Sequence, residues 1–473
     1  MAEWAVVTLS RKRKKRFEMG HPWIFVTEIE SISGDPEPGA IVAIHDEKGR
    51  RVGTGTYHPT SQIRVRVFSE GAEAPVGLLP GVGGMSKEWI ATQLREAWTY
   101  RQRWVTNPKA CRVLFGEADF VPGLVADRFD SVIVIQLLTV GTEVARDAIV
   151  AAIREVFEPL GVKGIYERSD VGVRMLEGLE LRTGVLWGVC PDLVDIEENG
   201  IQLSVDIVNG QKTGYFFDQQ LNRRLLKPLM QGWGVRGGVQ AIEEVDPSDG
   251  SVRKVVRNSN GKEVTFPFWD GATVLDAFSH SGGFTMNACN YGAKSVTCLD
   301  VSETAVEQAR ANMARNGFSD RVEFVCADAF EFLRNQVSAL EMRKERSQAA
   351  KQKVDTSVAL PKARQWDVII LDPPAFAKSR NAVDGALRGY KEINLQALKL
   401  ISDGGFLVTA SCSYHVHPEL FMEVVQAAAI DAGKTLRLIE FRGAGPDHPQ
   451  RIGVEEGNYL KFAIFEVRTR RSV

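Results

Sequence analysis

The sequence predicts a multidomain α/β protein with a small N-terminal β-barrel module, a central α/β module and a C-terminal doubly wound α/β unit. Residues 1–75 hold short apolar strands separated by turns rich in Gly and Pro. Strands alternate with amphipathic helices over 80–190, and near-continuous apolar strands alternate with helices from 191 onward. That alternation is typical of a parallel sheet covered by helices on both faces.

Composition excludes several classes of protein. Net charge is −2 over 473 residues, so any nucleic-acid surface must be local. The six cysteines are scattered without a C-x-x-C pair, which argues against a disulfide framework and against a zinc site. We find no membrane-spanning apolar run and no signal peptide. We therefore expect a cytoplasmic protein with reduced thiols, no metal and no membrane partner.

The N-terminal module, 1–75, carries one candidate RNA-binding element. Strands are expected at 41–44 and 63–68, and 20–25 is expected to form a short helix. A basic run precedes that helix, and a basic entry to a small β-barrel suits the binding of RNA phosphates. The run could equally be a solvated face. It comprises Arg11, Lys12, Arg13, Lys14, Lys15 and Arg16.

The central module follows a Gly- and Pro-rich linker at 71–85. An amphipathic helix is predicted over 86–104 with Ser86 as its N-cap. Strands at 112–115, 132–138 and 164–167 and a helix at 143–157 complete the module. The polar loop residues beside these strands are interpreted as salt-bridge and turn residues rather than catalytic groups; they are Glu117, Asp119, Asp127 and Arg128.

The C-terminal unit, 191–473, repeats a strand–helix pattern. After a strand at 201–208 and an aromatic turn at 210–224, strands are predicted at 274–277, 295–299, 322–325, 366–371, 405–410, 436–441 and 460–467. Helices are predicted at 284–291, 302–316 and 418–432. Two polar segments interrupt the pattern. We interpret 232–269 as an inserted hairpin or mobile loop, and 336–365 as a helical extension or a disordered insertion.

Polar residues follow successive strands of this unit, at the edge where open α/β sheets bind ligands. The glycine loop 278–283 lacks the G-x-G-x-x-G pattern, which favours a mononucleoside such as S-adenosylmethionine over a dinucleotide. The loop would lie under the methionine part, Asp300 would take the ribose hydroxyls and Asp328 the adenine amino group. The predicted cofactor-binding residues are Asp276, Phe278, Ser279, Gly282, Gly283, Asp300, Asp328 and Asp372.

Two further motifs at this edge indicate the substrate. Asp372-Pro373-Pro374 ends a buried strand, and its prolines would form a rigid wall for a planar base beside an acid. Cys412 lies just beyond the next strand, where a thiolate could add to C6 of cytosine and activate C5. A strand terminator and an inert core cysteine are the plain alternatives. We find no general base for the C5 proton.

At these residues the chain resembles the rRNA large subunit methyltransferase I family, class I S-adenosylmethionine-dependent enzymes that make 5-methylcytosine in bacterial 23S rRNA. The motifs run from end to end: Gly20-His21-Pro22-Trp23, Gly116-Glu117-Ala118-Asp119, Pro122-Gly123, Tyr166-Glu167-Arg168-Ser169-Asp170, Lys212-Thr213-Gly214-Tyr215-Phe216-Phe217-Asp218-Gln219, Ser281-Gly282-Gly283-Phe284, Asp372-Pro373-Pro374-Ala375-Phe376, Arg388-Gly389-Tyr390-Lys391, Ser411-Cys412-Ser413, Asp447-His448-Pro449 and Tyr459-Leu460-Lys461.

The resemblance implies an RNA-binding PUA domain, a central α/β domain and a Rossmann-like methyltransferase. It implies that Cys412 is the nucleophile, that Phe217 and Asp218 lie near the cofactor, and that 23S rRNA is the partner. The segments 232–269 and 336–365 depart from the compact family pattern, and insertions near a site change what docks there.

Two other functions stay open at this point. An N-methyltransferase of exocyclic base amines also carries a D/N-P-P motif, although an aromatic residue usually follows the prolines directly and here Ala375 intervenes. An RNA-binding assembly factor with a vestigial site would not need the intact acids and Cys412. The modified nucleotide and the oligomeric state, including a homodimer, are likewise open.

Overall fold

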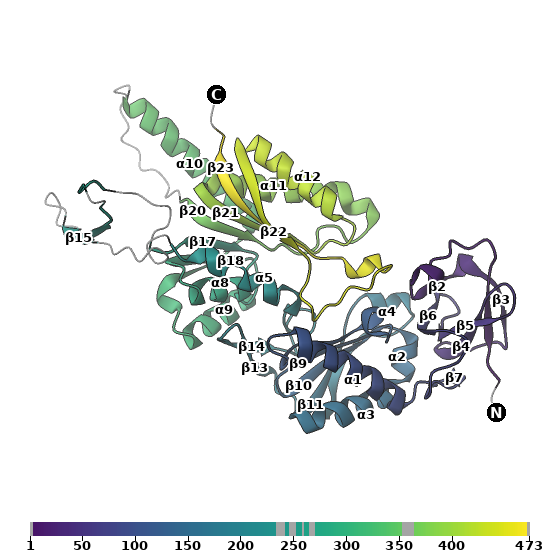
Figure 1. Cartoon of the computed structure of the whole chain (residues 1–473). Helices are drawn as coiled ribbons and strands as arrows, with labels where there is room; N and C mark the ends of the chain where they lie inside the picture. Colours follow the sequence, from purple (N-terminus) through teal and green to yellow (C-terminus); the bar gives the residue numbers. More distant parts are fainter. Residues whose placement is uncertain are drawn as a thin grey trace. The chain divides into compact units, whose positions relative to one another are not determined.

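The computed structural model describes residues 3–232, 242–245, 252–257, 260–263, 270–351 and 364–470 (Figure 1). The chain divides into two compact units. Unit 1 is Met1–Gln220 with Ala444–Asn458, and unit 2 is Leu221–Gly443 with Tyr459–Val473. A short late segment therefore returns to unit 1, which no sequence pattern indicated. The predicted domain boundaries near 75, 80 and 190 stay predictions.

Unit 1 begins with a β domain whose strands pair in the order β2-β6-β5-β4-β1-β3, with β7 beside β4. Only β1 and β4 are parallel among these pairs. The strands are β1 (Val6–Leu9), β2 (Trp23–Phe25), β3 (Ile29–Ser33), β4 (Ala40–His45), β5 (Arg51–Tyr57), β6 (Ile63–Glu70) and β7 (Gly81–Val82). Inward-facing apolar residues of five of these strands, with Phe17, fill its core.

The helix predicted at 20–25 is wrong. A single 3₁₀ turn, Phe17–Met19, ends at Gly20, whose φ of 87° is in the left-handed region. Pro22 then disfavours helical backbone at the residue before it. The chain continues as β2, which pairs antiparallel with β6.

The central module is a five-stranded sheet in the order β12-β11-β10-β9-β8, covered by two long helices. Its elements are α1 (Lys87–Trp104), β8 (Ala110–Phe115), β9 (Leu124–Phe129), β10 (Val132–Leu137), α2 (Val140–Val144), α3 (Arg146–Phe157), β11 (Gly164–Ser169), α4 (Val173–Leu176) and β12 (Arg182–Gly188). Ser86 caps α1 as predicted, because its hydroxyl accepts from Trp89 N. A hairpin of β13 (Leu193–Glu198) and β14 (Ile201–Asp206) follows.

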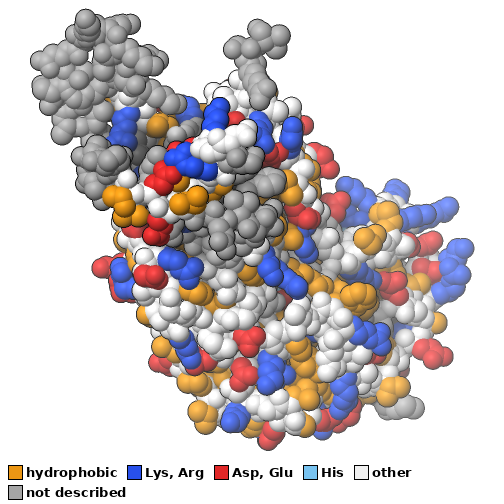
Figure 2. Space-filling model, turned by 60° about the vertical axis from the view of Figure 1, so that its left-hand side comes forward, with side chains coloured by type: hydrophobic (Ala, Val, Ile, Leu, Met, Phe, Trp, Pro, Cys, Tyr) orange, Lys and Arg blue, Asp and Glu red, His pale blue; other side chains and the backbone are white. Residues whose placement is uncertain are grey.

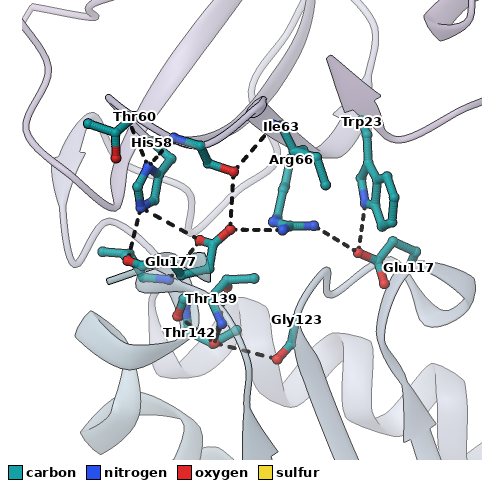
Figure 3. Close-up of polar contacts among 12 residues, drawn as sticks. Trp23, His58, Thr60, Ile63, Arg66, Glu117, Gly123, Thr139, Thr142 and Glu177 are labelled. Carbon is teal, nitrogen blue, oxygen red and sulfur yellow. Dashed lines mark hydrogen bonds and ion pairs between the residues drawn. The ribbon is translucent and has the colours of Figure 1, made fainter. Parts of the chain in front are cut away.

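A polar cluster joins the β domain to the central module within unit 1 (Figure 3). Arg66 of β6 donates to Glu177 Oε1 at 2.9 Å and lies 3.6 Å from Glu117 Oε1. Trp23 Nε1 donates to the same Glu117 oxygen at 2.8 Å, and His58 Nε2 lies 3.1 Å from the Glu177 carbonyl oxygen. Because Arg66 and Glu177 are both buried, this pairing is required to satisfy two buried charges.

Unit 2 is built on a seven-stranded sheet in the order β19-β18-β17-β20-β21-β23-β22. Its strands are β17 (Thr273–Ala277), β18 (Ser295–Asp300), β19 (Val322–Cys326), β20 (Trp366–Leu371), β21 (Ile401–Ser411), β22 (Lys434–Arg442) and β23 (Lys461–Thr469). The first five are mutually parallel, whereas β23 runs antiparallel to both of its neighbours.

Helices cover both faces of this sheet (Figure 1). They are α8 (Gly283–Asn290), α9 (Glu303–Arg315), α10 (Ala329–Lys351), α11 (Val383–Leu400) and α12 (Pro418–Asp431). Leu275, Ile369 and Leu407 pack with α10, α11 and α12, whereas Val368 and Val408 pack with α8 on the other face. Neighbouring residues of a strand point to opposite faces, so both must be apolar. This is why these strands are continuous apolar runs in the sequence.

The two polar segments are described in part. Within 232–269, β15 (Ile242–Val245) and β16 (Val252–Val255) pair as an antiparallel hairpin, one of the two predicted forms. The segment 336–365 begins as the last part of α10, in keeping with a helical extension. Residues 352–363 lie outside the described residues.

The returning segment Ala444–Asn458 is held in unit 1 by a buried arginine. Arg101 is fully buried at the end of α1, donates to both carboxylate oxygens of Asp119 at 2.6 and 2.7 Å, and donates to Asp447 O at 2.9 Å. Asp127 pairs likewise with Arg112 at 2.7 Å. The predicted salt-bridge roles of Asp119 and Asp127 are confirmed. The predicted loop position of Asp127 and Arg128 is wrong, because both lie within the strand β9.

Replacing Arg101 by Met should destabilise the protein by about 3–5 kcal/mol, because the nearly buried Asp119 carboxylate would lose its partner. Chemical denaturation followed by tryptophan fluorescence measures the loss. Arg103→Met, two residues further and exposed, should change stability by less than about 0.5 kcal/mol. Equal losses in both variants would contradict the role given to the pair.

Candidate active site

The glycine loop after β17 is held closed by a buried carboxylate. Asp276 is fully buried, and its Oδ2 accepts from the backbone N (2.9 Å) and the hydroxyl (2.6 Å) of Thr285 on α8. Its Oδ1 has no hydrogen-bond partner in the described part of the chain. Burial raises the pKa of Asp276 to about 7, against the two Thr285 hydrogen bonds and with a further rise from Asp372.

Every second residue of the loop from Phe278 to Gly282 has a left-handed backbone conformation. Phe278, His280 and Gly282 have φ values of 64°, 51° and 83°. A side chain at Gly282 would also lie 3.0 Å from Ala309 Cβ and Met313 Cε of α9. Left-handed backbone at two non-glycine residues costs roughly 1–3 kcal/mol each and persists where a site demands it. Gly282 therefore has a packing reason in addition to its predicted cofactor role.

Asp300 at the end of β18 supports the same loop. Its Oδ2 accepts from His280 N at 2.8 Å and its Oδ1 from Ser302 N at 2.9 Å. Ser279 N donates to Leu299 O at 3.0 Å, so the loop crosses the end of β18. Each Asp300 oxygen keeps a second lone pair for a ligand hydroxyl. The geometry is compatible with the predicted ribose contact.

The remaining strand-end acids lie at the same edge. Asp328 follows β19, is exposed, and caps α10 by accepting from Glu331 N at 2.9 Å. Asp372 follows β20, and its backbone N is 3.5 Å from Ala277 O of β17. The unpaired Asp276 oxygen, the accepting Asp300 and the exposed Asp328 fit a cofactor with an amino group, a diol and an adenine.

The two predicted substrate motifs meet at the edge that carries the glycine loop. The Cys412 thiol donates to Pro373 O at 3.8 Å, a sulfur hydrogen bond that joins the ends of β21 and β20. Ala377 N donates to Ser413 Oγ at 3.1 Å, which makes a second link between the two loops. Pro374 is exposed and Cys412 partly exposed, while Pro373, Ser411 and Ser413 are buried. The predicted wall and the predicted nucleophile are thus brought together.

A buried tyrosine fixes the turn that presents Cys412. Tyr390 of α11 lies within 2.9 Å of the hydroxyls of both Ser411 and Ser413. Its ring packs on Phe376 at 4.7 Å between centroids, Phe376 packs on Phe330 at 5.8 Å, and Phe330 packs on Phe278 at 6.3 Å. Aromatic contacts therefore run from the glycine loop to the residues on each side of Cys412.

The other cysteines differ in environment. Burial raises the pKa of Cys289 and of Cys298 to about 12, and that of Cys190 to about 11. Burial also raises the pKa of Cys111 well above its usual value. These thiols are therefore not nucleophiles at neutral pH. Among the described residues, no group of His, Cys, Asp and Glu side chains is arranged to hold a metal ion.

Phe217 and Asp218 belong to unit 1. Phe217 is 2% exposed and packs against Phe129 at 5.0 Å and Tyr215 at 5.5 Å. Asp218 is also buried and pairs with Lys212 at 3.3 Å. Their predicted cofactor role stays a prediction, since these contacts are all within unit 1.

The basic run divides into two groups. Arg11, Lys12, Lys14 and Lys15 are exposed. The Arg13 side chain is 8% exposed and pairs with Glu18 and with Glu47, the latter at 2.9 Å. Arg16 lies over the Phe25 ring at 4.9 Å. Four of the six cations are therefore available to a phosphate backbone, while Arg13 is used by the fold.

A hollow of about 500 Å³ lies at the opposite edge of the unit 2 sheet, lined by the first residues of β17, β18, β19 and β20. Ligands of open α/β sheets bind at the carboxyl edge. We therefore do not assign this hollow to the cofactor. On the face drawn in Figure 2, Lys and Arg are interspersed with Asp and Glu, in keeping with the small net charge.

Two known protein families match parts of this chain, and known relatives match nearly all of it. The PUA-like domain family matches residues 7–70, and the family described as conserved hypothetical protein 95 matches residues 238–341. The ribosomal RNA large subunit methyltransferase I of Pseudoalteromonas translucida is 35% identical over 98% of this chain and 99% of its own. The protein of the same name from Photobacterium profundum is 34% identical over 97% and 98%.

The chain belongs to the ribosomal RNA large subunit methyltransferase I family. Solved structures agree at the level of the fold. A SAM-dependent methyltransferase from Streptococcus mutans has a TM-score of 0.69 at 17% identity and covers 98% of this chain and 99% of its own. A methyltransferase complexed with SAH has a TM-score of 0.70 at 17% identity, with the same coverage. The predicted PUA-like β domain, methyltransferase fold and S-adenosylmethionine cofactor are confirmed.

Several residues of the site were not predicted. Tyr390 and Lys461 lie in motifs by which the sequence resembles the rRNA large subunit methyltransferase I family, but their chemistry gave no signal. No element was predicted around Tyr390, and Lys461 was only one residue of the strand predicted at 460–467. Thr285, which binds Asp276, is one of several small polar residues after the glycine loop. Their roles depend on strand order and register, which the sequence does not state.

The buried Asp276 predicts a pH dependence of stability. Because its folded-state pKa of about 7 exceeds the usual 3.8, its stabilising contribution is complete below pH 3.8 and is lost as pH rises through 7. The free energy of unfolding should fall by roughly 1 kcal/mol between pH 6 and 8. Asp276→Asn, which cannot ionise, should lack this component. Equal slopes in the two proteins, measured by denaturation without ligand, would contradict it.

Proposed function

We propose that the protein transfers a methyl group from S-adenosylmethionine to C5 of a cytosine in 23S rRNA, through a covalent adduct with Cys412. The observation that carries the proposal is the Cys412 thiol, partly exposed and 3.8 Å from Pro373 O at the edge that holds the cofactor loop. Two relatives are named ribosomal RNA large subunit methyltransferase I, which supports an rRNA of the large ribosomal subunit as the substrate.

The chemistry needs a nucleophile because C5 of cytosine is unreactive. Addition of the Cys412 thiolate to C6 makes C5 enamine-like and nucleophilic. The bound cofactor supplies an electrophilic methyl group on a sulfonium. Once C5 carries the methyl group, loss of the C5 proton reforms the C5–C6 double bond and expels the thiolate. The cytosine must be unpaired or flipped from its stack for Cys412 to reach C6.

Asp372 and the prolines are proposed to hold the base. Pro374 is exposed and Pro373 is buried, so one rigid apolar surface faces outward beside Asp372. A protonated Asp372 would donate to N3 of the ring and favour addition at C6. The exposed Arg11, Lys12, Lys14 and Lys15 are proposed to bind RNA phosphates, which position the substrate without reading its sequence.

An rRNA substrate and a free thiol nucleophile both suit a reducing cytoplasm, which is the compartment we propose. None of the helices among the described residues is long and apolar enough to cross a bilayer.

Cys412→Ala should abolish formation of 5-methylcytosine, lowering the rate by at least about 10³-fold, because C5 would no longer be activated. Mass spectrometry of nucleosides from 23S rRNA incubated with the protein and S-adenosylmethionine measures it. Cys326→Ala, which removes the exposed thiol of the last residue of β19, should keep wild-type activity. Retained activity in Cys412→Ala would exclude the nucleophile. An N-methylated nucleoside as the product would exclude the cytosine-C5 reaction.

Changing the four exposed basic residues Arg11, Lys12, Lys14 and Lys15 to Gln should weaken RNA binding and flatten its salt dependence. The slope of log K against log salt should fall by about 2–3 for single-stranded RNA. Filter binding at several salt concentrations measures it. A set of exposed cations of equal charge elsewhere in unit 1 controls for net charge: Arg95, Arg103, Arg154 and Lys163. An unchanged slope in the first set would mean that the run is only solvated.

A further inference from the structure

Lys461 is a buried lysine beside Cys412. It is the first residue of β23, and the antiparallel register places it opposite Ser411, the residue before Cys412. Its residue exposure is 1%. Lysine is rarely buried to this degree unless its ammonium group has a partner or a function.

The ammonium group contacts the turn that presents Cys412. Lys461 Nζ donates to Ser413 O at 2.6 Å and to Tyr459 O at 2.7 Å. Among the described residues, no carboxylate lies within ion-pair distance of it. Two carbonyl oxygens only partly replace the water that the charge has lost, and burial lowers the pKa of Lys461 to about 8.

Cys412 acts against this effect of burial on the pKa of Lys461. A thiolate at Cys412 raises the pKa of Lys461, because the two opposite charges attract. This coupling is reciprocal, so the ammonium favours the thiolate by the same free energy. A fixed positive charge beside a thiol is a common means of activating it.

Other titratable groups also lie around Cys412. Tyr390 on α11 bonds Ser411 and Ser413, and burial raises its pKa, so it stays a neutral phenol. Asp372 precedes Pro373 at the end of β20 and would oppose a thiolate if ionised. His415 follows in the same turn, where its ring packs on Tyr414 at 5.0 Å.

We propose that Lys461 is a positioning residue for Cys412: its ammonium group ties the turn 411–413 to β23 and favours the thiolate form of the nucleophile. This rests on the proposed role of Cys412. The antiparallel direction of β23 makes the arrangement possible, since its first residue lies where the parallel strands end.

The pH dependence of Cys412 alkylation tests this without RNA or cofactor. Iodoacetamide labelling, followed peptide by peptide with mass spectrometry, reports the pH at which half of Cys412 is thiolate. Lys461→Gln, which keeps a hydrogen-bond donor but not the charge, should raise that midpoint by roughly one pH unit and slow labelling at pH 7 about tenfold. Lys461→Arg should stay within a few tenths of a unit of wild type.

Lys294→Met is the matched control, because Lys294 is exposed at the opposite edge of the same sheet. It should leave the midpoint unchanged. An unchanged midpoint in Lys461→Gln would overturn the proposal. If Lys461→Gln does not fold, Lys461→Arg serves as the test. A labelling midpoint raised by one pH unit in Lys461→Arg would also overturn the proposal. Failure of Cys412 as the nucleophile would show in the methylation assay of Cys412→Ala and leave the alkylation result intact.

Discussion

The whole active site depends on the burial of the unit 2 sheet on both faces. Leu275 and Ile369 pack on one layer of helices and Val368 and Val408 on the other. Polar side chains therefore have few places in the strands except near their ends. In a parallel sheet these ends share one edge, which brings the glycine loop, Asp372-Pro373-Pro374 and Cys412 together from segments far apart in sequence.

The antiparallel strand β23 places its first residue at the ligand-binding edge. The last residues of the parallel strands lie at that edge, whereas the residue of β23 that lies there is its first, Lys461. The turn after β21 is thus held from two sides, by Lys461 through a carbonyl oxygen and by Tyr390 through two serine hydroxyls. Such double support suits the proposed role of Cys412, because a nucleophile must keep its position while a base enters.

Periodicity in the sequence predicted elements whose apolar pattern is strong. The amphipathic helix with its Ser86 cap and the apolar strands that were predicted lie where expected, because burial on a sheet or helix face imposes the pattern. The buried strand β9 and the helix α11 were not predicted. The strand-end acids were found from position alone. The region 20–25 was misread because a glycine–proline boundary, rather than periodicity, decides its backbone.

The features that were not predicted depend on tertiary contacts. The segment Ala444–Asn458 joins unit 1 through Arg101, and no local signal at Asp447 indicates a partner on α1. The Arg13 side chain forms ion pairs with Glu18 and Glu47, and its position in a basic run gives no sign of them. Lys461 meets the turn after β21 only through strand register. Such contacts link residues distant in sequence, and residue type alone cannot reveal them.

The most direct test of the central claim is to trap the adduct. RNA in which the target cytosine carries fluorine at C5 cannot lose the C5 substituent as a proton, so the thiolate should not be expelled after methylation. Incubation of the protein with this RNA and S-adenosylmethionine should give a stable protein–RNA conjugate, which peptide mass spectrometry maps to Cys412. A methylated product without a conjugate, or a conjugate at another residue, would contradict the account.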